Sequence, residues 1–236
     1  MTKDKIKDIL DTLDTIQEQL LALPEDMLLN IDPRDNESLD NGVAFIKTFN
    51  KNLTQFSFSA TQLAEQIKTY LKINPEEEEV EQENSNRQKR DRIIKELDKT
   101  SPHSLEEDFT YKRPFGFVLG DTAMKGLKTW KNLYIHVLNI YRKKEPDSFL
   151  KLHLNERFIS SRGNPLFSKT GKELRVAEKL ADDFYLEINM SANMIRNAIR
   201  DVLEYFGDKP MEMKVYLRED RDVRDGTEGH DKKRLN

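Results

Sequence analysis

Apolar residues recur at three- and four-residue steps through the first seventy positions, which is the spacing of an amphipathic helix. Residues 4–23 predict one helix, and Pro24 is expected to end it. The turn formers of 30–42 predict a loop, and the helical spacing resumes from about Ser38 to Lys72. The apolar positions are Ile6, Ile9, Leu10, Leu13, Ile16, Leu20 and Leu23, then Val43, Ile46, Phe49, Leu53, Phe56, Ala60, Leu63, Ile67, Tyr70 and Leu71.

Residues 1–74 therefore predict a helical hairpin for association or docking. A two-helix unit buries a small fraction of its surface and is marginal alone. We expect it to pack on another copy, on the C-terminal domain or on a partner.

The composition and the periodicity of the sequence change after Asn74-Pro75. The stretch EEEEVEQENSNRQKR (76–90) is acidic and without periodicity, so residues 75–108 predict a charged, partly disordered linker with a short helix near 92–99. The tail 218–236 has almost no apolar residues and is predicted to be disordered.

Residues 109–217 mix both periodicities, which predicts a small α+β domain with a mixed or antiparallel sheet. A strand and turn are expected at 111–121, a second strand or turn at 124–130, and further strands at 184–189 and at 211–217. Helices are expected at 129–144, 147–154 and 192–206, loop and short strand at 157–169, and one or two helical turns at 172–181.

The composition restricts the chemistry. Among 236 residues, 36% are hydrophobic and 35% charged, and cysteine is absent, which removes disulfides, cysteine nucleophiles and cysteine-based metal centres. The first residues lack the apolar run of a signal peptide, and no stretch approaches the length of a membrane span. We expect a soluble, cytoplasmic protein without membrane contact.

The net charge of −4 conceals an uneven layout. Residues 1–108 contain 24 acidic and 14 basic residues, residues 109–175 contain 5 and 14, and residues 176–236 contain 14 and 11. A basic block thus lies between two acidic flanks, which points to an anionic partner.

This block can bind phosphates, because clustered cations release counterions and aromatic rings can stack on bases. The alternative is that the cations are a solvated surface and that the aromatics, several of them at helical spacing, fill the core. The candidate nucleic-acid-binding residues are Lys112, Arg113, Lys125, Lys128, Lys131, Arg142, Lys143, Lys144, Arg157, Arg162, Lys169 and Lys172. The interleaved aromatics are Tyr111, Trp130, Tyr134, Tyr141, Phe158 and Phe167.

The anionic partner could also be internal. The acidic run at 76–79 lies on the predicted linker and could cover the basic block, as a mimic of nucleic acid would. That arrangement would be autoinhibitory.

A polar turn precedes the helix predicted at 192–206. Ser191 and Asn193 are suited to accept hydrogen bonds from backbone N–H groups that lack partners at a helix start. The same N–H groups could bind an anion such as phosphate. A helix cap is the simpler interpretation, and an anion site is the alternative.

Catalytic patterns are weak. Glu212 and Lys214 form an E-x-K on a predicted strand, with Asp182-Asp183 before an earlier one, as in metal-dependent nucleases, but an intervening helix gives the wrong order. The histidines (His103, His136, His153 and His230) lack metal-ligand spacing, Ser160-Ser161 lack a nucleophile elbow, and glycine-rich phosphate loops are absent. We predict neither an enzyme nor a cofactor or metal.

One pattern resembles a known family. The string W-K-x-L, then F-S at 167–168, then E-L-R, then Y-L-E-I-N-x-S-A-N-x-I resembles an uncharacterised domain at the C-terminus of assorted bacterial proteins of mobile-element or phage-defence loci. The resemblance covers residues 111–217. It implies a bacterial origin and a nucleic-acid context, and it carries no catalytic residues.

These features together predict a non-enzymatic, two-part protein. Its basic C-terminal domain would contact nucleic-acid phosphates with little sequence readout, and its hairpin would mediate self-association or bind a protein partner. The alternatives are an interaction adaptor without nucleic-acid binding and, less favoured, a nuclease that uses Glu212 and Lys214.

Overall fold

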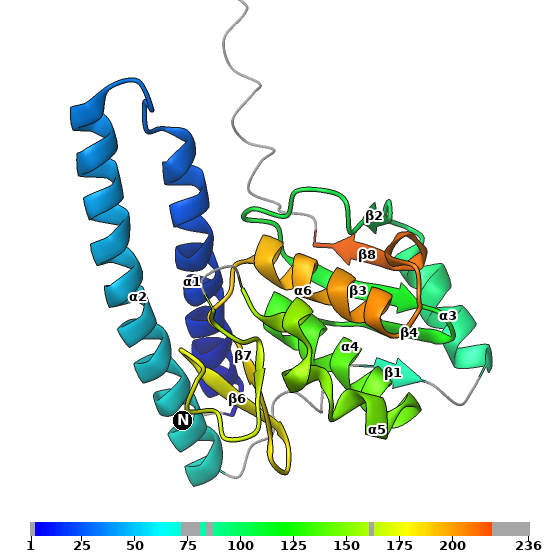
Figure 1. Ribbon diagram of the computed structural model, residues 1–236. Helices are drawn as coiled ribbons and strands as arrows, with labels where there is room; N and C mark the ends of the chain where they lie inside the picture. Colours follow the sequence, from blue (N-terminus) through cyan, green and yellow to red (C-terminus); the bar gives the residue numbers. More distant parts are fainter. Residues whose placement is uncertain (1–2, 72–80, 84–86, 161–162, 219–236) are drawn as a thin grey trace, which may run out of the picture.

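The computed structural model describes residues 3–71, 81–83, 87–160 and 163–218. The fold is α+β, as predicted (Figure 1). The parts of the predicted linker at 72–80 and 84–86, the tail from 219 onward and Arg162 lie outside the described residues.

The N-terminal third is a helical hairpin of two long helices, α1 (Lys3–Leu29) and α2 (Asn36–Leu71) (Figure 1). The Asp35 carboxylate accepts a hydrogen bond from the backbone N–H of Glu37 at 3.0 Å and so helps to start α2. The prediction that Pro24 ends the first helix is wrong, because α1 continues through it. Proline removes only one backbone donor, and the rest of the helix retains its hydrogen bonds.

The C-terminal domain contains two antiparallel sheets. The larger has the strand order β1-β4-β3-β8-β2, with β3 in the middle, and the smaller has the order β5-β7-β6. The strands are β1 (Glu81–Glu83), β2 (His103–Ser104), β3 (Pro114–Leu119), β4 (Thr122–Lys125), β5 (Phe167–Ser168), β6 (Ala177–Ala181), β7 (Phe184–Glu187) and β8 (Lys214–Leu217).

Helices cover both faces of the larger sheet. The main core joins α4 and α6 to residues such as Phe117 of β3, whereas Ile93 and Leu97 of α3 pack against Ala123 and Tyr216 on the other face. The helices of the domain are α3 (Arg87–Leu97), α4 (Trp130–Lys144), α5 (Pro146–Phe149) and α6 (Ala192–Tyr205), with short 3₁₀ turns η1 (Leu152–Leu154), η2 (Glu156–Phe158) and η3 (Pro210–Glu212).

The smaller sheet closes the other end of the main core. Phe167 and Phe184, from β5 and β7, lie 5.5 Å apart between ring centroids, and Phe149 lies 4.7 Å from Phe184. The aromatic residues of the basic block therefore mostly fill the interior. Trp130, Tyr134, Tyr141, Phe158 and Phe167 are all buried, and only Tyr111 is exposed.

Several local predictions need correction. The segment 172–181 contains the strand β6 instead of helical turns, and the predicted strand 211–217 starts only at Lys214, after η3. The segment 87–108 is not linker, because α3 and β2 pack within the domain. Short segments of this kind take their structure from tertiary partners, which local pattern does not report. No helix in the described part of the chain is long and apolar enough to cross a membrane.

Gly116 of β3 provides a test of this packing. A Cβ atom there would lie 2.4 Å from the carbonyl oxygen of Met124 and 2.8 Å from Leu97 Cδ2. Because backbone cannot move aside cheaply, Gly116→Ala should lower the free energy of unfolding by about 3 kcal/mol in urea titrations.

The control is Gly120→Ala. Gly120 has a φ of +52° and open space around its Cα, so alanine there should cost only about 1 kcal/mol of backbone strain. Equal losses in the two variants would contradict the tight approach of β4 and α3 to Gly116.

Candidate protein-interaction surfaces and the polar junction

The hairpin meets the domain through a row of carboxylates on α1. Asp11, Asp14, Glu18 and Glu25 follow at steps of three, four and seven residues, which places them on one side of the helix. All four side chains reach groups of the C-terminal domain. The polar side of the amphipathic helix is therefore the side that packs on the domain.

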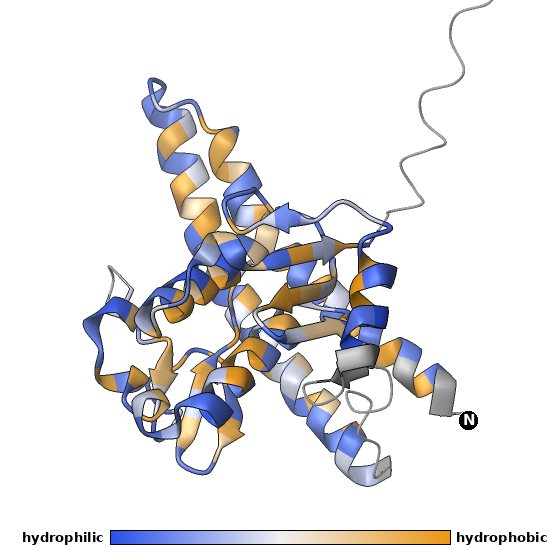
Figure 2. Ribbon diagram, turned by 90° about the vertical axis from the view of Figure 1, so that its right-hand side faces the viewer, coloured by the Kyte–Doolittle hydropathy of each residue, from blue (hydrophilic) through white to orange (hydrophobic). Residues whose placement is uncertain are grey.

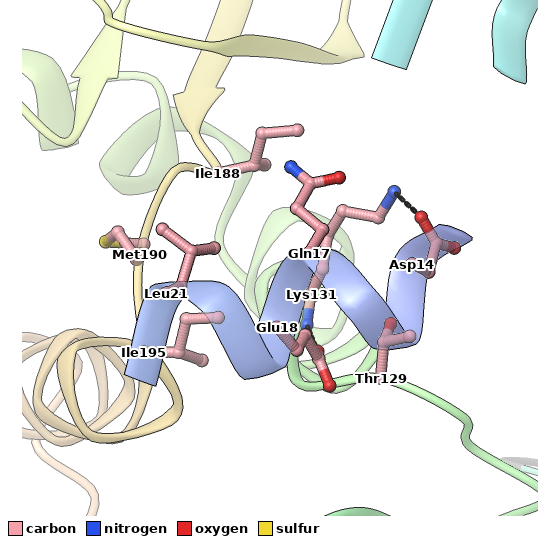
Figure 3. A pocket seen from close by; sticks show the side chains of 9 residues that line it. All are labelled: Asp14, Gln17, Glu18, Leu21, Thr129, Lys131, Ile188, Met190 and Ile195. Atoms are coloured by element: carbon pink, nitrogen blue, oxygen red, sulfur yellow. Dashed lines mark hydrogen bonds and ion pairs between the residues drawn. The ribbon is translucent and has the colours of Figure 1, made fainter. Parts of the chain in front are cut away.

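Glu18 lies at the start of α4 (Figure 3). Its carboxylate accepts hydrogen bonds from the backbone N–H groups of Trp130 and Lys131, the latter at 3.4 Å. The Thr129 side chain accepts from the Asn132 N–H at 3.1 Å, so the first donors of the helix are shared between a cap and a carboxylate. Burial of the Glu18 carboxyl group raises its pKa to about 8, against the lowering effect of these hydrogen bonds.

Two lysines beside the same helix start meet the neighbouring acids. Lys128 Nζ lies 2.7 Å from Asp11 Oδ2. Lys131 Nζ lies 3.7 Å from Asp14 Oδ1, the pair joined by the dashed line in Figure 3. The cover proposed for the basic block was placed at 76–79, which is outside the described residues. The carboxylates that do meet Lys128 and Lys131 belong to α1.

The turn before α6 is a helix cap that also contacts a carboxylate. Ser191 Oγ accepts a hydrogen bond from the Met194 N–H at 3.3 Å, as a cap does, and donates one to the carboxylate of Glu25. Asn193 Nδ2 donates to the other oxygen of Glu25 at 3.0 Å, and its Oδ1 accepts from the Phe109 N–H at 2.9 Å. The anion found at this helix start is thus a side chain of α1, while phosphate binding there stays a prediction.

The motif that carries the family resemblance forms a connected polar network beside this turn. Glu187 is buried, and its carboxylate accepts from the backbone N–H groups of Arg175 and Asn189, at 2.7 Å each. Asn189 Nδ2 in turn donates to Thr54 Oγ1 of α2 at 3.3 Å. Residues of the motif therefore hold the turn that contacts α2 of the hairpin. The sequence alone did not indicate this role.

The basic block does not form one open patch. Lys125 pairs with Glu96 at 2.5 Å, Lys144 with Asp208 at 3.6 Å and Arg157 with Glu204 at 3.2 Å. Arg142 donates to the Leu180 carbonyl at 3.2 Å. Lys128 and Lys131 pair with acids of α1. Half of the predicted nucleic-acid-binding cations therefore already have an internal partner.

The remaining predicted cations lie on separate elements. Lys112 and Arg113 precede β3, Lys143 is in the last turn of α4, and Lys169 and Lys172 lie between β5 and β6. Among the described residues none of these five has an ion pair, although the Lys112 ammonium lies 5.8 Å from the Phe109 ring centroid.

The groups considered for catalysis are not gathered. Glu212 is in η3 and pairs with Lys209 at 3.5 Å, so the expectation that Glu212 and Lys214 share a strand is wrong. Asp182-Asp183 form the turn between β6 and β7 in the smaller sheet. His103 bonds Glu107 at 2.8 Å, and the described residues contain no group of three side chains suited to hold a metal.

The side of the hairpin opposite the carboxylate row is apolar. We call this surface the outer face, and it includes exposed Ile9, Ile16, Phe45, Phe56, Leu63 and Tyr70. Half-buried apolar residues complete it, namely Leu13, Leu20, Leu23 and Phe49.

Comparison with family models, with curated proteins and with solved structures gives no match.

Glu18 makes the junction sensitive to pH. The pKa of its carboxyl group is about 8 in the folded protein and 4.5 without burial, so between these values the folded state holds one more proton. Its stabilising contribution is complete below pH 4.5 and is lost as pH rises through 8, with a slope of at most about 1.4 kcal/mol per pH unit.

Glu18→Gln should remove this slope, because the amide oxygen still accepts from the two N–H groups and does not ionise. Urea unfolding monitored by the fluorescence of Trp130, the single tryptophan, should show a stability difference in favour of the variant that grows from pH 5 to pH 9. A difference that stays constant over this range would contradict the burial of Glu18.

Proposed function

We propose that this chain is a non-enzymatic binding protein whose C-terminal domain fixes the hairpin with its outer face toward solvent, so that this face binds a protein surface. One observation carries the proposal. The charged side of α1 contacts the domain, and among the described residues the apolar rows of both helices stay partly exposed.

Such an orientation is unfavourable for an isolated chain. An amphipathic helix ordinarily packs its apolar side on the core and leaves its charges in water. Here exposed fractions reach 51% at Leu63 and 87% at Tyr70, within a row of apolar residues. Contiguous exposed apolar surface of this kind marks an interaction site in soluble proteins.

The outer face should bind an apolar dye in dilute protein. Phe56→Lys combined with Leu63→Lys should reduce the fluorescence of an anilinonaphthalene dye severalfold at nanomolar protein, because both side chains are exposed there. Asn50→Lys is the matched control, since Asn50 is exposed on the same helix but off the apolar row. Equal dye binding by the three proteins would exclude the outer face as an open apolar surface.

Contact with nucleic-acid phosphates is the second part of the proposal. It is supported by the five cations that have no ion pair among the described residues, since free cations are the groups that release counterions from a phosphate backbone. They lie on several elements, so they favour contacts along a backbone over readout of bases. The bacterial, mobile-element context implied by the resemblance agrees with this part and stays a prediction.

Fluorescence anisotropy of the full chain with mixed-sequence DNA and RNA tests this part. We expect binding at low salt that weakens steeply with salt, and a weaker affinity in Lys169→Glu combined with Lys172→Glu. Lys47→Glu combined with Lys51→Glu on α2 is the control for net charge, since both lysines are exposed. Absence of binding at low salt would leave the protein-interaction part standing alone.

A further inference from the structure

The apolar residues of α2 on the outer face follow a seven-residue repeat. Phe49, Phe56, Leu63 and Tyr70 are seven positions apart, and Phe45 precedes them by four. At about 100° per residue, all five fall within an arc of about 60° on the helix. A seven-residue apolar repeat is the pattern by which helices pack side by side over many turns.

Helix α1 carries a matching row. Ile9, Leu13, Ile16, Leu20 and Leu23 alternate steps of four and three residues, the spacing of a coiled-coil seam. Ile9 is 56% exposed and Ile16 is 43% exposed, so the seam has no complete partner among the residues that the structure describes.

The two rows lie on the same side of the hairpin. On α1 the row is opposite the carboxylates that contact the domain, and on α2 it is opposite Thr54, which contacts Asn189. The buried residues Leu53 and Ala60 of α2 lie between these two sides. The outer face is therefore one continuous surface of two antiparallel helices that points away from the domain. Figure 2 shows apolar residues recurring along the end of the hairpin that projects past the domain.

The outer face carries almost no charge. Every charged residue of α2 after Gly42 lies on the opposite side, and these residues are Lys47, Lys51, Glu65 and Lys68. Between Ile9 and Leu23 of α1, the residues on the outer side are likewise uncharged, with Thr12 and Gln19 as its polar members. Asn52 and Ser59 take the corresponding places on α2.

We propose that the occupant of the outer face is a second copy of this chain, and that the two hairpins form a four-helix bundle. The inference rests on the proposed function and names its partner. A two-fold interface requires the same patch on both subunits, and an uncharged patch meets itself without repulsion between like charges. A charged partner would instead lose the hydration of its charges with nothing to pair them.

The size of the outer face fits a stable dimer. Residues 45–70 of α2 span about 38 Å at 1.5 Å per residue. The α1 row, residues 9–23, spans about 21 Å, so at about 10 Å of width per helix each copy would contribute about 590 Å². Stable interfaces bury about 600 to about 1,000 Å² on each partner. The uncharged polar residue Asn52 can fix the register of such a bundle, as polar residues do within apolar seams.

Sedimentation and light scattering of the full chain test the proposal across nanomolar to micromolar concentrations. The wild type should reach twice the mass of one chain, and apolar dye binding should fall as the dimer forms. Phe56→Lys combined with Leu63→Lys should raise the dissociation constant by about 30-fold or more, because both residues lie at the centre of the bundle. Asn50→Lys should dimerise like the wild type.

Two further readings separate the outcomes. The chain has no cysteine, so Ser59→Cys gives a single thiol on the outer face, which a bis-maleimide should join into a covalent dimer. Unchanged far-ultraviolet circular dichroism and Trp130 emission in the lysine variant show that its fold is intact.

A wild type that stays monomeric at micromolar concentration overturns the second copy as the partner. If that monomer still binds dye through Phe56 and Leu63, the outer face remains an open interaction surface and the proposed function stands. If its dye binding is the same in the lysine variant, the proposed function fails as well.

Discussion

The orientation of the hairpin depends on carboxylates of α1 that lie at the starts of two helices of the domain. Glu18 accepts from the first N–H groups of α4, and Glu25 contacts Ser191 and Asn193 at the start of α6. Helix starts carry unpaired backbone donors, and an acceptor oxygen of a glutamate side chain satisfies them. Because these two sites lie on one side of α1, they determine which side of the hairpin meets the domain.

That constraint explains why an amphipathic hairpin shows its apolar side to water. The domain attracts the carboxylates through N–H groups and lysines, and the apolar rows of both helices are turned away together. The domain has its own complete core, built around Phe117, Trp130 and Phe184, and so does not need the apolar residues of the hairpin. The outer face is then available for association, and this is the basis of both proposals.

Strong periodicity was sufficient to predict much of the fold. The hairpin, α4 and α6 lie where helical spacing placed them, and the α+β class follows from the alternating segments after residue 109. The prediction of helical turns at 172–181 is wrong because the strand there is short and takes its structure from pairing with β7, which the local sequence does not show. Pro24 was expected to stop the first helix, yet α1 continues through it.

The junction was only partly predictable. Ser191 was expected to cap a helix and does so, but its second partner, Glu25, lies 166 positions away in the chain. The spacing of Asp11, Asp14 and Glu18 was visible in the sequence, yet the same spacing is typical of a solvated helix face. The charge excess of the basic block was real, but the sequence did not show that Lys128 and Lys131 meet acids of α1.

The junction at α4 has an evolutionary consequence, because its donors to Glu18 belong to the main chain. A substitution of Trp130 or Lys131 changes a side chain but leaves the N–H group in place. Selection to keep the hairpin docked therefore acts mainly on α1, and on the need for a helix to begin at residue 130. Homologous chains can thus diverge in the side chains at residues 130 and 131 while they keep a side chain with an acceptor oxygen at the position of Glu18.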